Sequence, residues 1–264
     1  MLPSDPAVPD LLKRGRIEVE GRLVDASNAT LYCEISGADE VAHCVYKPIS
    51  GERALWDFPD GTLAGRELSA YLVSEAAGVH LVPPTVMRSG PFGPGMVQFW
   101  VDTKEGDDLV DVLPPADVPK GWRRVLRAHD RFGEPAILAH ADHPSVRMMA
   151  ALDVVINNAD RKGGHVLHAT DGNVYGVDHG ICLHTEDKLR TVLWGWVGEA
   201  LPEDVVAMLA RLRSAVDDRL GAELREHLTK AEIRALRNRI EELEHRREFP
   251  TPGADYRAIP WPAF

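Results

Sequence analysis

Two aspartates set 18 residues apart constrain this chain more than any other feature of its sequence. Asp160 follows the apolar run 144–156, and Asp178 precedes a histidine and a glycine. Between them, an apolar run is followed by Asp-Gly-Asn at 171–173, a tight-turn sequence that predicts a β-hairpin. The paired strands would hold one carboxylate at the mouth of the hairpin and the other at its end.

Phosphoryl transfer from a nucleotide requires two carboxylates placed in this way. One orients or deprotonates the attacking group, and the other holds magnesium against the phosphates. Residues 144–156 are apolar on most faces, which is typical of a buried helix that ends just before Asp160. The order of buried helix, Asp-Arg loop, hairpin and Asp-x-Gly is found in the C-terminal lobe of kinases. For either aspartate alone, a solvated turn is the alternative.

Upstream residues supply the other charges that such a site needs. Lys47 stands among apolar residues in a predicted strand over 43–49, where burial is costly without a charge partner. Glu67 lies in the first turn of a predicted helix for which Gly78 is a C-terminal stop. We therefore expect Glu67 to pair with Lys47 and the ammonium to face the nucleotide phosphates. A surface lysine and a surface glutamate are the alternative.

A polar loop near the N-terminus is a candidate phosphate-binding element. Alternating residues predict strands over 17–24 and 31–35 on either side of it. Within the loop, Ser27, Asn28 and Thr30 allow the backbone to approach a phosphate and donate hydrogen bonds, although a glycine-rich fingerprint is missing.

A later apolar strand, over 95–102, is a candidate for the linker that passes the adenine ring in a two-lobed kinase. Its place in the order of elements favours this interpretation, and a plain core strand explains the residues equally well. On the linker interpretation, Phe99 and Val101 are candidate nucleotide-binding residues.

The order of these motifs resembles that of the phosphatidylinositol 3-/4-kinase-like superfamily. The motifs are Ser-Asn-Ala-Thr at 27–30, Val-Tyr-Lys-Pro at 45–48, Arg-Glu-Leu at 66–68, Asn-Ala-Asp-Arg at 158–161 and Val-Asp-His-Gly at 177–180. Residues 51–61 and 189–196 are similar to signatures of a small actinobacterial family that carries the same label by similarity. The resemblance covers about residues 18–243. It implies an α+β, two-lobed protein-kinase-like fold with ATP and Mg²⁺ or Mn²⁺ as cofactors.

On the matching positions, the resemblance implies a role for each charged residue. Lys47 would contact the phosphates, Glu67 would hold that lysine, Asp160 would be the catalytic-loop aspartate, and Asp178 would bind the metal ion. Five residues after the catalytic aspartate the superfamily usually has asparagine as a second metal ligand, but this chain has His165. Imidazole is a poor ligand for Mg²⁺, which prefers oxygen. The histidine therefore predicts a one-metal site, a preference for Mn²⁺, or impaired catalysis.

If His165 is a metal ligand, metal-dependent activity should fall as the pH drops through about 6.5, the ordinary histidine pKa. Packing beneath the hairpin, or a hydrogen bond to the Asp160 loop, is the alternative role for this side chain.

The predicted elements divide the chain into four parts. We expect a loose arm over 1–14, a mainly β N-lobe over 15–102, a mainly α C-lobe over 103–249 and a tail over 250–264. A short helix is expected at 107–112 within the C-lobe.

Composition limits the partners. With a net charge of −11, strong non-specific binding to nucleic acid is not expected, and docking on an anionic bilayer is disfavoured. No apolar run approaches the length of a membrane span, so we expect no integral membrane association. The three cysteines lie in apolar strand contexts, which favours buried thiols and a cytoplasmic location.

Three functions remain open. The first is an ATP- and metal-dependent phosphotransferase acting on a protein or small polar substrate, less readily on a lipid, with the phosphate acceptor unknown. The second is a pseudokinase, a nucleotide-binding regulatory module without turnover. The third is a metal-dependent hydrolase that uses the aspartates and the histidines near the motif, His165, His168, His179 and His184, although no zinc-ligand spacing occurs there.

Overall fold

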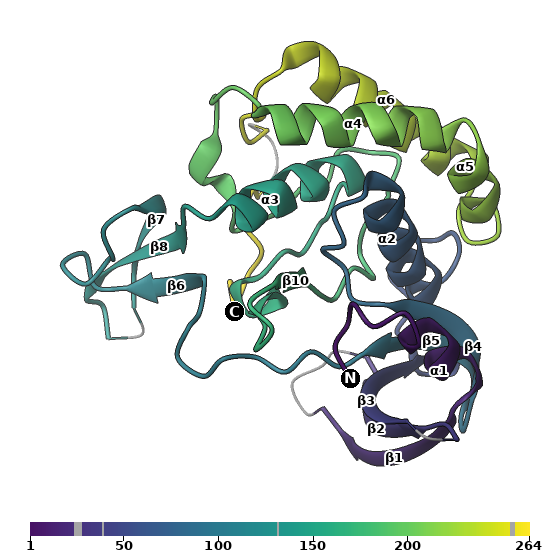
Figure 1. Cartoon of the computed structure of the whole chain (residues 1–264). Helices are drawn as coiled ribbons and strands as arrows, with labels where there is room; N and C mark the ends of the chain where they lie inside the picture. Colours follow the sequence, from purple (N-terminus) through teal and green to yellow (C-terminus); the bar gives the residue numbers. More distant parts are fainter. Residues whose placement is uncertain (24–27, 39, 131, 254–256) are drawn as a thin grey trace.

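An antiparallel sheet forms the N-terminal part of the protein (Figure 1). The computed structural model describes residues 1–23, 28–38, 40–130, 132–253 and 257–264. Five strands pair in the order β1-β2-β3-β5-β4, with β3 in the centre. They are β1 (Arg16–Arg22), β2 (Leu31–Ser36), β3 (Val41–Pro48), β4 (Thr85–Gly90) and β5 (Gly93–Phe99). The predicted strands at 17–24, 31–35, 43–49 and 95–102 correspond to β1, β2, β3 and β5.

One face of this sheet is covered by α1 (Val8–Arg14), which follows a proline-rich start. Three of its apolar side chains, Val8, Leu11 and Leu12, are buried and pack in one cluster with Cys44 and Tyr46 of β3. The prediction of a loose arm over 1–14 is therefore wrong for residues 8–14. Proline at the start of a helix is compatible with α1, because its missing N–H has no intrahelical partner there.

Helix α2 (Leu63–Ala77) contacts β4 and β5 and is fixed at both ends. The Thr62 side chain accepts the Gly65 N–H at the N-terminus, and the carboxylate of Glu52 accepts the N–H groups of Leu63 and Ala64. Gly78 ends the helix in the left-handed conformation at φ +67°, as its position in the sequence predicts. The short helix η1 (Ile49–Gly51) follows β3 and precedes Glu52.

A second sheet follows the linker and projects away from the first (Figure 1). It pairs β6 (Val110–Leu113) and β7 (Trp122–His129) with the central strand β8 (Pro135–Ala141). The short helix predicted at 107–112 is wrong, because Val110 to Leu113 pair with residues 137–140 of β8. Strand β8 leads into α3 (Pro144–Ile156), whose Val146, Met149 and Leu152 are buried.

The predicted hairpin is present directly after α3. The 3₁₀ helix η2 (Gly163–His165) leads into β9 (Val166–His168), which pairs with β10 (Val174–Gly176). Asn157 ends α3 in the left-handed conformation at φ +52°, so that the chain turns into the loop containing Asp160.

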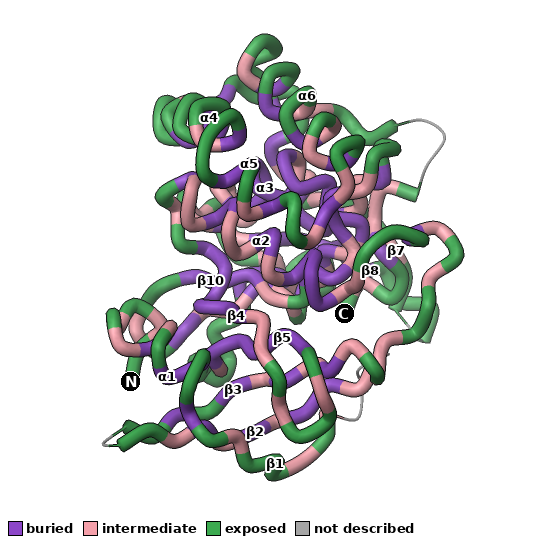
Figure 2. The backbone as a smooth tube through the Cα atoms, turned by 90° about the vertical axis from the view of Figure 1, so that its right-hand side faces the viewer, coloured by how far each residue is buried: buried purple, intermediate pink, exposed green. Residues whose placement is uncertain are grey.

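Helices form the outer layer of the C-terminal part (Figure 1). They are α4 (Glu203–Val216), α5 (Arg219–Leu224) and α6 (Lys230–Arg246), with the short η3 (Trp194–Trp196) before them. Their apolar faces pack with α2 and α3 in the main core cluster, whereas their outer faces are exposed (Figure 2). The capping box predicted at Thr229 and Glu232 begins α6.

The C-terminal tail returns to the loops near the hairpin (Figure 1). The Ala258 carbonyl accepts the Thr191 N–H and the Trp194 Nε1–H, and the Ala263 carbonyl accepts the Gly163 N–H. Among the described residues, no helix is both long and apolar enough to cross a membrane.

Candidate active site

A cleft of about 620 Å³ lies beside the β3 face that carries Lys47. It is lined by residues from the sheet, from α2, from the linker after β5, from the Asp160 loop and from the Asp178 segment. Consecutive strand residues point to opposite faces, so the burial of Tyr46 against α1 directs Lys47 into this cleft. Lys47, Glu67, Asp160, Asp178 and His165 all line it.

Lys47 is held between two carboxylates. Its Nζ lies 2.5 Å from Glu67 Oε1 and 2.8 Å from Asp178 Oδ1. Burial acts to lower the pKa of Lys47, but the carboxylates of Asp178 and Glu67 outweigh it and raise that pKa. Burial raises the pKa of Glu67, which Lys47 opposes, and the second Glu67 oxygen accepts the His179 N–H at 2.9 Å. The Lys47–Glu67 pair therefore links β3, α2 and the segment after Asp178.

The two aspartates have different environments. The Lys47 ammonium holds the pKa of Asp178 far below its ordinary range, and about half of the Asp178 side chain is exposed to the cleft. Burial instead raises the pKa of Asp160, whose carboxylate lies 3.9 Å from Lys162 Nζ. The Asn158 side chain accepts the Asp160 N–H at 3.0 Å and orders the turn. The environment of Asp178 thus favours the ionised carboxylate, whereas that of Asp160 makes protonation easier.

His165 faces the Asp178 carboxylate. Its Nε2 lies 3.4 Å from Asp178 Oδ2, and its Nδ1 lies 3.1 Å from the carbonyl oxygen of Asp160. A carbonyl only accepts hydrogen bonds, so Nδ1 carries the proton and the Nε2 lone pair is directed towards Asp178. Burial lowers the pKa of His165 to about 4. The expected pH dependence near 6.5 therefore needs correction, because this imidazole stays neutral well below that pH.

The predicted nucleotide contacts lie along the same cleft, with one exception. Asn28, Thr30, Phe99 and Val101 line it. The Asn28 side chain accepts the backbone N–H of Arg53 at 2.9 Å, so it orders the loop in addition to facing the cleft. Ser27 lies outside the described residues.

The linker residue Val101 is buried beside the cleft. Within the described part of the chain, neither its N–H nor its carbonyl has a backbone partner, whereas the neighbouring Trp100 N–H donates to the His43 carbonyl. Val101 therefore lines the cleft with a backbone donor and acceptor that no other described backbone group occupies.

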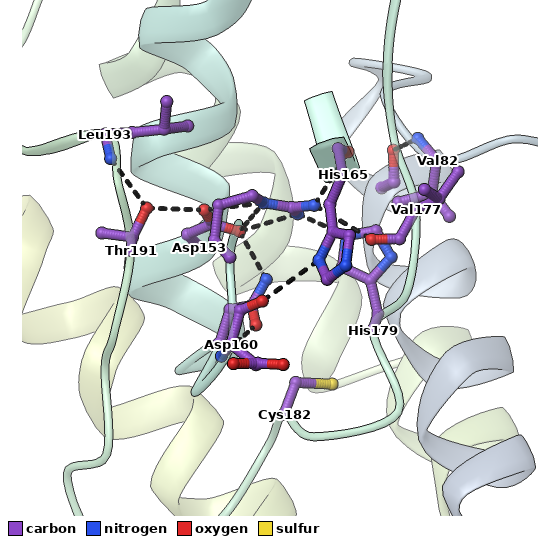
Figure 3. A network of polar contacts seen from close by, with 12 residues as sticks. Val82, Asp153, Asp160, His165, Val177, His179, Cys182, Thr191 and Leu193 are labelled. Carbon is purple, nitrogen blue, oxygen red and sulfur yellow. Dashed lines mark hydrogen bonds and ion pairs between the residues drawn. The ribbon is translucent and has the colours of Figure 1, made fainter. Parts of the chain in front are cut away.

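A buried arginine next to Asp160 was not predicted from the sequence. Arg161 is fully buried and pairs with the equally buried Asp153 of α3, which Figure 3 labels. Its guanidinium also donates to the carbonyls of His165 and Val177 and lies 2.6 Å from His179 Nε2. Burial and the Arg161 charge lower the pKa of His179, which keeps that ring a neutral acceptor. A carboxylate within an apolar helix, Asp153, is the sequence signal that could have revealed this contact.

Two of the histidines considered for a hydrolase, His168 and His184, lie away from His165 and His179 and have other partners. His168 lies 3.0 Å from Asp107, and the His184 ring packs against Phe58. Among the residues that the structure describes, one group of three potential metal ligands converges within 4.8 Å, namely Glu20, Glu34 and His43 on strands β1, β2 and β3. It contains none of the histidines near the motif.

Comparison with known proteins shows the family. No protein-family model matches the sequence. Protein Rv2133c of Mycobacterium tuberculosis is 51% identical over 263 residues, which cover 96% of this chain and 94% of that protein. The chain belongs to the family of protein Rv2133c. A relationship this close over almost the full length of both chains implies one shared fold.

Solved structures show which fold this is. The Golgi casein kinase with Mn/ADP bound matches with a TM-score of 0.54 and 13% identity, covering 92% of this chain and 76% of that one. The hydra Fam20 structure with sugar matches with a TM-score of 0.51 and 13% identity, covering 90% and 86%. At this identity the likeness concerns the fold alone. The predicted α+β fold of the protein-kinase-like type is thereby confirmed.

Proposed function

We propose that this protein is an ATP- and metal-dependent phosphotransferase of the kinase type. The observation that carries the proposal is the convergence of Lys47, Glu67, Asp160 and Asp178 on one cleft. In the sequence these residues are spread over more than 130 positions, and their gathering has a simple chemical use. An ammonium neutralises phosphate oxygens, one carboxylate binds a metal ion, and another accepts a proton. The kinase-like fold supports the same reaction class.

Each residue has a distinct proposed role. Lys47, kept charged by Glu67 and Asp178, binds the phosphates. Asp160 has a raised pKa and faces the cleft, so it can accept the proton of an acceptor hydroxyl as the new phosphate ester bond forms. The backbone of Val101 would pair with the adenine edge, and Phe99 would line the same end of the cleft.

The donor set around Asp178 fits a divalent metal ion. Oδ2 of the half-exposed Asp178 carboxylate lies 3.4 Å from His165 Nε2. The Asp160 carbonyl fixes the orientation of the imidazole. A bound ion would neutralise phosphate charge and orient the nucleotide. The mixed nitrogen and oxygen ligands favour Mn²⁺ over Mg²⁺. The neighbouring Golgi casein kinase structure, which contains Mn/ADP, supports this choice.

We further propose that residues 15–102 form the N-lobe, 103–249 the C-lobe and 250–264 a tail, with the nucleotide between the lobes. The resemblance to the phosphatidylinositol 3-/4-kinase-like superfamily belongs to this proposal, as does a cytoplasmic location. A protein or small polar acceptor is favoured over a lipid, because a chain with a net charge of −11 is repelled by anionic bilayers.

A nucleotide-binding module without turnover is the second candidate, and His165 at the second ligand position is the observation that favours it. A thermal-shift series with ATP and ADP, each with Mn²⁺ or Mg²⁺, tests nucleotide binding, and phosphate release from ATP tests turnover. We expect stabilisation by Mn²⁺ with nucleotide and slow ATP hydrolysis that Asp160→Asn abolishes. Stabilisation without turnover would identify the second candidate, and no response to any nucleotide would refute both.

A further inference from the structure

Arg161 makes more polar contacts in the site region than its place beside Asp160 requires. The side chain is fully buried, with Nε 3.0 Å from Asp153 Oδ2 and Nη2 2.9 Å from Asp153 Oδ1. Nη1 donates to the carbonyls of His165 at 3.3 Å and Val177 at 3.0 Å. Nη2 lies 2.6 Å from His179 Nε2 and therefore donates to that ring.

Stability does not account for this arrangement. A buried ion pair rarely stabilises a fold more than apolar residues of the same volume would, because both charges lose their hydration. His179 adds a further cost. When its Nε2 accepts from Arg161, its Nδ1 carries the proton, and among the described residues this buried atom has no hydrogen-bond partner. A buried polar atom without a partner calls for an explanation other than stability, and a geometry that the network fixes is one.

The contacts of Arg161 fix the positions of chain segments in the candidate site. Val177 and His179 flank Asp178 in the chain, so one guanidinium holds the backbone before that carboxylate and the side chain after it. It also holds the carbonyl of His165, and it is bonded directly to Asp160 through the chain.

The same pair reaches the segment that follows the site (Figure 3). Thr191 Oγ1 lies 3.3 Å from Asp153 Oδ2 and accepts the Leu193 N–H at 3.1 Å. Figure 3 shows Thr191 and Leu193 on one side of the network and His165, Val177 and His179 on the other. The network thus spans the distance between the Thr191 segment and the candidate metal ligands.

The surrounding chain leaves room for the guanidinium. A side chain at Gly176 would place its Cβ 3.0 Å from Arg161 Nη2 and 3.2 Å from Nη1. Glycine at this position allows the β10 backbone to pass close to the charge.

We infer that Arg161, anchored by Asp153, is a positioning residue that sets Asp178 and His165 relative to Asp160. The catalytic use of the positioned groups rests on the proposed function. The contacts through which Arg161 holds them do not depend on it. Loss of the planar guanidinium should release the Asp178 segment while leaving the rest of the core packed. Because Thr191 contacts Asp153, a shift of the Thr191 segment should also move Arg161 and the candidate metal ligands that it holds.

The test uses Arg161→Lys with Arg66→Lys as a matched control. Lysine keeps one charge beside the carboxylate but lacks the planar fork that reaches several acceptors. Arg66 is also fully buried and pairs with buried Glu232 at 2.5 Å, yet it makes no hydrogen bond to Asp178, His165 or Asp160 in the described residues. Both variants disturb a buried pair of the same kind, so a general loss of stability should appear in both.

Two measurements separate positioning from stability. Native-state amide exchange of the ligand-free protein should become at least about tenfold faster over 177–179 in Arg161→Lys and stay unchanged there in Arg66→Lys. Affinity for ADP in the presence of Mn²⁺ should fall about 10- to 100-fold in Arg161→Lys alone. Wild-type exchange and wild-type affinity in a folded Arg161→Lys protein, or equal losses in both variants, would overturn the inference.

If Arg161→Lys does not fold, Thr191→Val decides the question. It keeps both charges and removes only the hydroxyl that contacts Asp153. Faster exchange over 177–179 in this variant supports the coupling, and unchanged exchange overturns it. A wild-type protein that binds no nucleotide would refute the proposed function, whereas the exchange comparison would still decide the role of Arg161.

Discussion

Acidification should destabilise this protein through His140, whose environment allows the size of the effect to be worked out. The ring is fully buried on β8, its Nε2 accepts the Gly195 N–H at 3.0 Å, and its centroid lies 4.5 Å from that of Trp196. Burial lowers the pKa of His140 to about 4. In the unfolded chain the pKa is about 6.5, so between these values the unfolded state binds a proton that the folded state rejects.

This difference in proton binding lowers the stability in acid. His140 leaves the free energy of unfolding unaffected above about pH 6.5 and decreases it as the pH falls from there towards 4. At about 1.4 kcal/mol per pH unit, the loss between pH 7 and pH 5 is about 2 kcal/mol. Urea unfolding at the two pH values measures it, with His140→Gln as the reference because an amide oxygen can accept the Gly195 N–H without titrating.

The wild-type protein should lose about 2 kcal/mol more than His140→Gln over this interval. Contributions from the other buried histidines are common to both proteins and cancel in the difference. An equal loss in the two proteins would show that His140 titrates normally in the folded state, and the linkage argument would then be wrong.

Three further substitutions test separate parts of the structure. Asp178→Ala should abolish the stabilisation by nucleotide with Mn²⁺, which for the wild type at one hundred times Kd is about 2.7 kcal/mol, and a retained thermal shift would contradict its metal role. His165→Asn should shift the ratio of Mn²⁺- to Mg²⁺-dependent nucleotide affinity towards Mg²⁺, because it replaces a nitrogen ligand with oxygen; an unaltered ratio would leave packing as the role of the imidazole. Leu12→Ala should lower the free energy of unfolding by about 3 kcal/mol if α1 is part of the core, and a change below about 0.5 kcal/mol would indicate that α1 is detached.

The sequence predicted a helix or strand correctly where the residues that determine it lie within the element itself. The hairpin was predictable because its turn residues and its apolar strands lie within a dozen positions, and α2 because its stop at Gly78 is a backbone requirement. Helix α1 was missed because the prolines of residues 1–10 suggest a loose chain, while the burial of Leu12 depends on residues of β3 more than thirty positions away. Strand β6 was missed for the same reason, since its pairing partner β8 lies about 25 residues later.

In the candidate site, too, some features were predictable from short motifs and others were not. Residue types and spacing pointed to Lys47, Asp160 and Asp178, because each stands in a short motif with a recognisable chemical use. Nothing in those motifs predicts that Arg161 pairs with Asp153 or that burial lowers the pKa of His165 to about 4. Such properties depend on the surrounding packing, which a single sequence does not encode in local patterns.

Under the proposed function, the decisive step is an exchange of partners at Asp178. Asp178 bonds to Lys47 at 2.8 Å, so the two groups proposed to serve the nucleotide neutralise each other. To serve a nucleotide and a divalent ion together, Lys47 would have to turn from Asp178 towards the phosphates and leave the Asp178 carboxylate to hold the ion. His165 is already oriented for that ion by the Asp160 carbonyl, and its low pKa leaves the lone pair available at neutral pH. The metal and the nucleotide should therefore bind cooperatively, and a protein in which either binds equally well alone would not use Asp178 in this way.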